Sequence, residues 1–146
     1  MKRYVQIAPM AILRAIATIA VRINVLNLTL FDQIQSGKNR ILITRKGHRY
    51  PPKRFADWRD AAVLSFRIQA KTCPELPYTK RCRLEVAYTP GDARTRDVAG
   101  MLDALCHCLE RAGIVVNDGL IQTVSWRQFG PEIKPRLDLT LEQEAP

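Results

Sequence analysis

The chain has 146 residues, of which 47% are hydrophobic and 25% charged, as expected for one globular domain. This composition excludes a disordered chain, a collagen-like repeat and a coiled coil. Its 23 Lys and Arg outnumber 14 Asp and Glu, which gives a formal net charge of +9. Such an excess predicts attraction to polyanions, to nucleic acid before acidic lipid.

The four cysteines do not form a CxxC pair, which disfavours a zinc finger or zinc ribbon. They are Cys73, Cys82, Cys106 and Cys108. Neighbouring side chains on a helix diverge by about 100°, so Cys106, His107 and Cys108 do not close around one ion. We expect buried or half-buried thiols in a reducing compartment.

Residues 1–22 stand apart from the rest of the chain. A basic start precedes an apolar run from Ile7 to Val21, which Pro9 and Arg14 interrupt. The run is shorter than the roughly 20 apolar residues that span a bilayer, and it lacks a clean cleavage site for export. We expect a short helical extension of the domain, or non-native sequence upstream of the true start.

The first half of the domain predicts two strands and a helix. Residues 23–30 read as a strand, 32–39 as a polar loop, 41–44 as a short strand and 46–48 as a turn. Two prolines then introduce a helix over residues 53–71. Its apolar stripe comprises Phe55, Trp58, Ala62, Phe66 and Gln69.

The second half adds strands and a second helix. Alternation over residues 81–88 predicts a half-buried strand, and an apolar stripe predicts a helix over 98–112 that Gly113 ends. Strands are expected at 114–116, 120–126 and 136–141, with the last closing the sheet and a polar tail over 142–146. The order predicts an α+β fold, a mixed β-sheet with two main helices packed on it.

A basic run without any acid extends from Lys38 to Arg54. Charged runs are often only solvated surface, but contacts to phosphates require uncompensated positive charge of this kind. We expect the run to contact the phosphates of a polyanion such as DNA, and we add Asn39 within the run and Arg96 further along the chain. The expected DNA-binding residues are Lys38, Asn39, Arg40, Arg45, Lys46, Arg49, Lys53, Arg54 and Arg96.

Three aspartates surround the second predicted helix and are candidate metal ligands. Asp97 precedes the helix, Asp103 lies within it and Asp118 follows it, while His107 lies one turn after Asp103. Magnesium or manganese needs two or three such carboxylates. Each acid also has an ordinary interpretation: Asp97 as a helix N-cap, Asp103 as a partner of His107, and Asp118 as part of a hairpin turn with Gly119.

These segments resemble a known family. Residues 96–100 (RDVAG), 102–105 (LDAL) and 111–118 (RAGIVVND) are similar to the signature of the RusA family, the Holliday-junction resolvases of bacteria and their phages. The loop 36–39 (SGKN) and the helix entry 50–53 (YPPK) resemble the family as well. The resemblance covers about residues 23–141 and leaves out residues 1–22.

The resemblance implies a cytoplasmic bacterial or phage homodimer that cleaves four-way DNA junctions in recombination and repair. It implies magnesium as the metal, with manganese as a substitute, and neither a membrane partner nor a small-molecule cofactor. Asp97 and Asp118 match family acids. Asp103 lies at a position that is Lys in some members and Glu in one subgroup. Asp97, Asp103 and Asp118 would then hold the metal. His107, one turn beyond Asp103, would orient a water or a carboxylate or sense the leaving group; an ordinary core or surface histidine is the alternative.

Three positions depart from the family pattern. Ala99 replaces a second aspartate at the helix start, Gly100 replaces an asparagine that commonly follows it, and Asn117 replaces the first acid of the closing pair. The alternative hypothesis is therefore a catalytically degenerate DNA-binding protein. A weaker third hypothesis is a protein that binds a membrane surface through residues 1–22 and the basic run.

Overall fold

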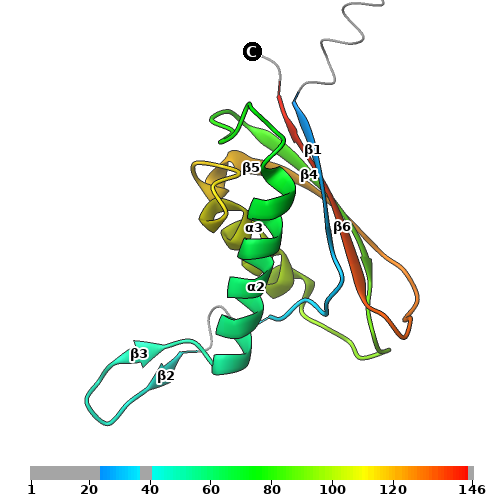
Figure 1. Ribbon diagram of the computed structural model, residues 1–146. Coiled ribbons are helices and arrows are strands. Elements are labelled where there is room, and N and C mark those ends of the chain that lie inside the picture. Colours follow the sequence, from blue (N-terminus) through cyan, green and yellow to red (C-terminus); the bar gives the residue numbers. More distant parts are fainter. Residues whose placement is uncertain (1–23, 37–40, 145–146) are drawn as a thin grey trace, which may run out of the picture.

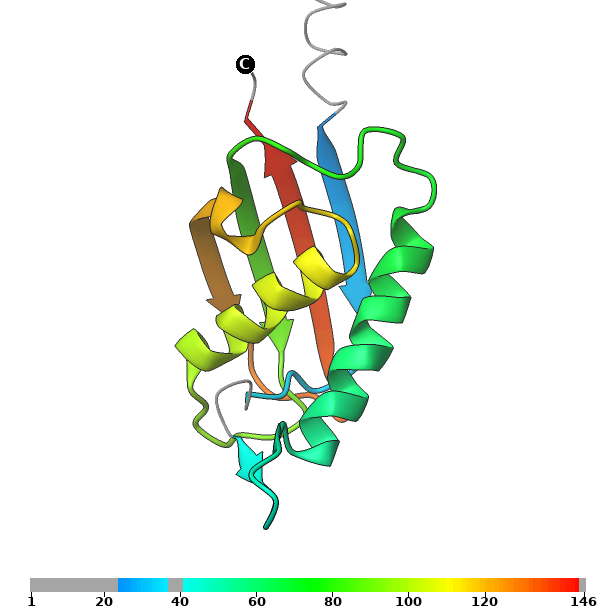
Figure 2. The ribbon, with the colours of Figure 1, turned by 90° about the vertical axis from the view of Figure 1, so that its left-hand side faces the viewer.

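The main sheet has four strands, and two helices cover one of its faces (Figures 1 and 2). The computed structural model describes residues 24–36 and 41–144, so the predicted extension lies outside the described residues. The strands run in the order β1 (Val25–Leu30), β6 (Arg136–Gln143), β4 (Cys82–Thr89) and β5 (Ile121–Gln128). β4 and β5 are parallel, and the other neighbours are antiparallel. The α+β prediction is confirmed.

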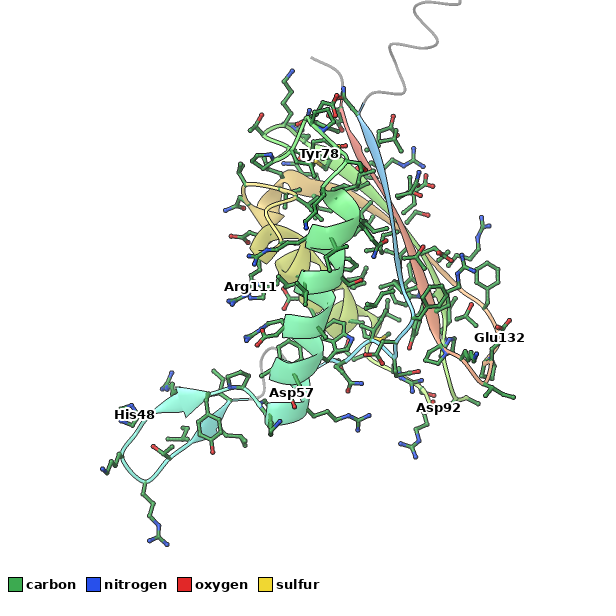
Figure 3. All side chains as sticks on the ribbon, in the orientation of Figure 1. His48, Asp57, Tyr78, Asp92, Arg111 and Glu132 are labelled. Atoms are coloured by element: carbon green, nitrogen blue, oxygen red, sulfur yellow. The ribbon has the colours of Figure 1, made fainter. Side chains whose placement is uncertain are left out.

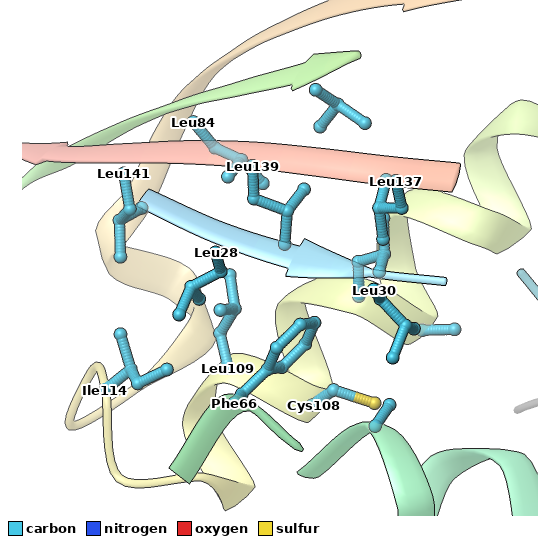
Figure 4. Packing of buried hydrophobic residues seen from close by; sticks show 14 of the residues in the cluster. Leu28, Leu30, Phe66, Leu84, Cys108, Leu109, Ile114, Leu137, Leu139 and Leu141 are labelled. Atoms are coloured by element: carbon cyan, nitrogen blue, oxygen red, sulfur yellow. The ribbon is translucent and has the colours of Figure 1, made fainter. Parts of the chain in front are cut away.

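Strict alternation of apolar and polar residues explains why only one face of the sheet is covered. Successive strand residues point to opposite faces, and every second residue of β1, β4 and β6 is apolar. Figure 4 shows leucines from these strands packed against residues of both helices and of the segment after α3. The inward set is Leu26, Leu28, Leu30, Cys82, Leu84, Val86, Tyr88, Leu137, Leu139 and Leu141.

Helix α2 (Lys53–Ala70) starts directly after Pro52, as the two prolines predict. Phe55, Trp58, Ala62 and Phe66 are buried, which confirms the stripe. Gln69, the polar member of the stripe, binds the backbone of β1 instead of packing in the core. Its Oε1 accepts a hydrogen bond from the Thr29 N–H (2.8 Å), and its Nε2 donates to the Thr29 carbonyl (2.7 Å). Because β1 is an edge strand, this amide occupies backbone groups that would otherwise be open to a further strand.

Helix α3 (Val98–Arg111) carries the chain from β4 across to the parallel strand β5. It ends as predicted, with Gly113 at a φ of +75°. The predicted strand at 114–116 is wrong in length: it forms a single parallel bridge, between Val115 and Tyr78. The chain turns soon afterwards into the 3-10 helix η1 (Asp118–Leu120), which leaves no room for a longer ladder.

The second predicted strand does not join the main sheet. β2 (Leu42–Ile43) instead pairs with β3 (Arg49–Tyr50), which the sequence did not suggest, in a hairpin that projects from the body beside the start of α2 (Figure 1). Gly47, with a φ of +81°, forms the predicted turn. The turn keeps β2 beside β3 through hydrogen bonds from Thr44 N–H to the His48 carbonyl and from Gly47 N–H to the Thr44 carbonyl.

Strand β6 also differs from its prediction. It lies between β1 and β4, and it continues to Gln143, into the predicted tail. Both of its neighbours pair with it over its whole length or nearly so, and its inward side chains Leu137, Leu139 and Leu141 are fully buried in the core with residues of both helices.

All four cysteines are thiols rather than disulfides, as expected. Burial raises the pKa of Cys82 to about 11 and that of Cys108 to about 12, so both stay protonated near neutral pH. Over residues 24–36 and 41–144, no helix has the length and hydropathy needed to cross a bilayer.

Candidate functional site

Three potential metal ligands come together on the outer side of α3. His107, Glu110 and Asp118 each offer one ligand atom, and these atoms all lie within 4.8 Å of one another. His107 and Glu110 share one face of α3 because they are three residues apart. All three side chains are half-buried, so the scaffold holds them while solvent still reaches them.

Asp118 reaches this group because of the turn that follows α3. Asn117 caps η1, since its Oδ1 accepts a hydrogen bond from the Gly119 N–H (2.7 Å). The Asp118 N–H donates to Oε2 of Glu110 at 3.3 Å, which ties the start of η1 to the end of α3. The side-chain hydrogen bond that stabilises the turn is therefore made by Asn117. The Asp118 carboxylate faces His107 and Glu110 instead.

Asp97 lies at the opposite end of α3 and serves as its N-cap. Its Oδ1 accepts a hydrogen bond from the Gly100 N–H (3.1 Å), so the ordinary interpretation of this acid is confirmed. A Cβ at position 100 would lie 2.6 Å from Oδ2 of Asp97, so a larger residue there would displace the capping carboxylate. Asp97 and His107 are ten positions apart along α3, a rise of about 15 Å at 1.5 Å per residue.

The remaining predicted acid, Asp103, is half-buried and lies one turn before His107. The structure thus brings together two of the four predicted site residues, His107 and Asp118. It does not bring Asp97 or Asp103 into the same group of three. Sequence reasoning missed Glu110, although its spacing of three from His107 on one helix face was available as a signal.

A cavity of about 240 Å³ opens beside His107. It lies between the base of the β2–β3 hairpin, the first two turns of α2 and the middle of α3. Its lining combines cationic and aromatic side chains and includes no acid: Ile41, Arg49, Tyr50, Pro51, Phe55, Arg59 and His107. Arg59 is held in place by Asp60, whose Oδ1 lies 2.8 Å from the Arg59 Nη2.

The described part of the basic run lies on the hairpin and at the start of α2, and Arg49 is its one member that lines the cavity. Arg45, Lys46 and Arg49 lie on the hairpin, whose turn carries His48 far from the sheet (Figure 3). Arg54 is exposed at the start of α2, whereas Lys53 forms an ion pair with Asp57 one turn later. Lys38, Asn39 and Arg40, which were expected to bind DNA, lie outside the described residues.

The Arg96 side chain, also predicted to bind DNA, is bonded to the protein's own loop. Its side chain is only 17% exposed, and its Nη2 lies 2.6 Å from Oδ1 of Asp92. Its Nη1 also donates to the Arg94 carbonyl (3.0 Å). Hydrogen bonds from the Arg94 N–H and from Arg96 hold the pKa of Asp92 below its ordinary value. Arg96 therefore stabilises the loop before α3 through these hydrogen bonds.

Ser36, the described residue of the 36–39 loop, lies near the start of α3. A Cβ at Gly100 would lie 3.5 Å from the Cβ of Ser36, so the start of α3 packs against the residue that opens the 36–39 loop. Comparison of the whole chain with models of protein families gives no match, and comparison with curated proteins gives none either.

Proposed function

We propose that this protein is a metal-dependent endodeoxyribonuclease that cleaves Holliday junctions or other branched DNA in recombination and repair. One observation carries the proposal: three metal-ligand side chains converge next to an arginine-lined cavity, at the foot of a basic hairpin. The resemblance of residues 96–118 to the RusA signature supports a DNA junction as the substrate.

The donor set of the group fits a divalent cation. Two carboxylates are enough for magnesium, which usually keeps several waters and takes oxygen ligands from protein and substrate phosphates. The imidazole of His107 adds a nitrogen donor, which suits manganese and other transition metals better than magnesium. A bound ion of this kind would polarise a phosphodiester and offset the negative charge that develops during hydrolysis.

The chain's own residues have separate tasks in this proposal. Glu110, Asp118 and His107 hold the ion, and Arg49 and Arg59 draw a phosphate into the neighbouring cavity. Arg45 and Lys46 contact the DNA backbone further out along the hairpin. In a homodimer, two such sites related by symmetry suit paired cuts in opposite strands.

The proposal is tested by cleavage of synthetic four-way junctions, duplexes and single strands, each with magnesium, manganese or a chelator. We expect paired nicks near the branch point in either metal and none with chelator. Junction binding without cleavage in every metal would contradict the proposal.

A second candidate function is junction binding without catalysis. It is favoured by the commitment of the Asp97 carboxylate to the N-cap of α3, and by Ala99 and Gly100 where the family carries a second acid and an asparagine. In this case the junction would stay uncleaved with or without chelator, and chelator would not change the affinity for the junction.

The ligand group makes a prediction about metal selectivity. Replacing His107 by Ala removes the only nitrogen donor of the group, so Mn²⁺ affinity is expected to fall by at least about tenfold while Mg²⁺ affinity changes little. Titration of Mn²⁺ followed by electron paramagnetic resonance gives the Mn²⁺ affinity, and displacement of bound Mn²⁺ by Mg²⁺ gives the Mg²⁺ affinity. His48→Ala, in the hairpin turn, is the matched control, and an equal loss of both metals in His107→Ala would contradict the assignment.

The hairpin makes a prediction about salt dependence. Replacing Arg45, Lys46 and Arg49 together by Ala is expected to lower the slope of log K against log[salt] by about one unit for each phosphate that the protein no longer neutralises. Junction binding measured across a series of salt concentrations gives the slope.

The matched control removes Lys71, Lys80 and Arg81, which are equally exposed but lie towards the other end of α2 and the sheet. Since it removes the same charge, it separates direct binding by the hairpin from the effect of net charge. An unchanged slope in the hairpin variant would show that the hairpin does not bind DNA.

A further inference from the structure

The cavity beside His107 has a lining that a phosphate alone would not require. Phe55 is 5% exposed at its floor and is fixed by Trp58, whose ring lies 5.9 Å away. Tyr50 and Ile41 remain 46% and 51% exposed on the hairpin side. The cavity has a volume of about 240 Å³, which is more than one phosphate requires.

We propose that this cavity captures one unpaired nucleotide of branched DNA, with its base against Tyr50 and its phosphate at Arg49 and Arg59. The inference rests on the proposed DNA substrate but not on cleavage. Aromatic side chains beside a positively charged groove are the usual means of binding single-stranded nucleic acid, because every base offers a face for stacking.

The occupant is unpaired because a paired base is stacked on both faces. A base must leave the helix to reach a side-chain pocket, and the cost is smallest where pairing is already weakened, as it is at a branch point. This preference distinguishes branched DNA from uninterrupted duplex without any interaction that reads the base sequence.

The position of the cavity connects base capture with the metal-ligand group. His107 lines the cavity and is also one of the three ligands, so the two sites share a wall. A nucleotide held against Tyr50 therefore brings its backbone next to Glu110 and Asp118. Capture would determine which phosphodiester of a junction reaches the ligand group.

The test measures binding to single-stranded and four-way-junction DNA in the presence of chelator. Tyr50→Ala is expected to weaken binding about five- to tenfold, near the lower end for one stacked base because Tyr50 is half exposed. The slope with salt should not change, because the substitution removes no positive charge. Tyr50→Phe keeps the ring and should bind like the unaltered protein, and Ile43→Ala on the same hairpin is the matched control.

The same junction with abasic residues at its branch point completes the test. If the ring and the base interact, Tyr50→Ala should cause no further loss of affinity on the abasic junction. An equal loss on both junctions, or Tyr50→Ala binding as tightly as Tyr50→Phe, would overturn base capture. Because chelator is present, these outcomes are independent of cleavage, so failure of the nuclease proposal and failure of base capture are read separately.

Discussion

Asp118→Asn is expected to reduce metal-dependent junction cleavage by about two to four orders of magnitude, since a catalytic ion supplies several kcal/mol of stabilisation. The substitution removes one anionic ligand from the group with His107 and Glu110. It leaves the turn intact, because Asn117 makes the hydrogen bond that caps η1. Junction binding should persist or tighten, since a negative charge near the phosphate is lost. Cleavage rates and binding constants, measured on one substrate, separate the two effects.

Asp97→Asn is the matched control, because asparagine caps a helix about as well as aspartate does. If Asp97 serves only as the N-cap of α3, both stability and cleavage should be unchanged. Asp103→Asn tests the remaining predicted ligand in the same way. Near-normal cleavage by Asp118→Asn would show that Asp118 is not a metal ligand. A large loss in Asp97→Asn would instead support the ligand set that the family resemblance implies.

Most of the fold could be predicted because its elements have clear periodicity. The stripe of α2 and the alternation of β4 each place apolar residues on one face, and such a pattern fixes both the element and its orientation. Pairing between distant segments has no comparable local signal. The two-residue strand β3 and the central position of β6 depend on which segments meet in space, and neither Arg49–Tyr50 nor Arg136–Gln143 shows its partner in its own sequence.

The candidate site could be predicted only in part for the same reason. The helical spacing of Asp103 and His107 was visible, but whether Asp118 folds back onto α3 depends on the cap that Asn117 provides. Glu110 was overlooked because an acid near a helix end is common on solvated surfaces. The cavity was not predictable at all, since it joins a hairpin, the start of α2 and the middle of α3.

The largest effect on stability is expected at Phe66, in the middle of α2. Its side chain has no solvent exposure and packs between the helices and the sheet, together with Cys108, Leu109 and Leu139 (Figure 4). Phe66→Ala both loses the transfer free energy of the ring and leaves a cavity, because a core clamped by three strands and two helices relaxes little. The free energy of unfolding should fall by about 3–5 kcal/mol.

Such a loss is a large part of the roughly 5–15 kcal/mol that stabilises a typical domain, so the variant should unfold at a clearly lower urea concentration. Urea denaturation followed by circular dichroism measures it. Leu64→Ala, on the same helix with a side chain that is 59% exposed, should change the stability by less than about 0.5 kcal/mol. Equal losses in the two variants would mean that α2 presents a different face to the sheet. Gln69 could then not reach Thr29, and Arg59 would not line the cavity beside His107.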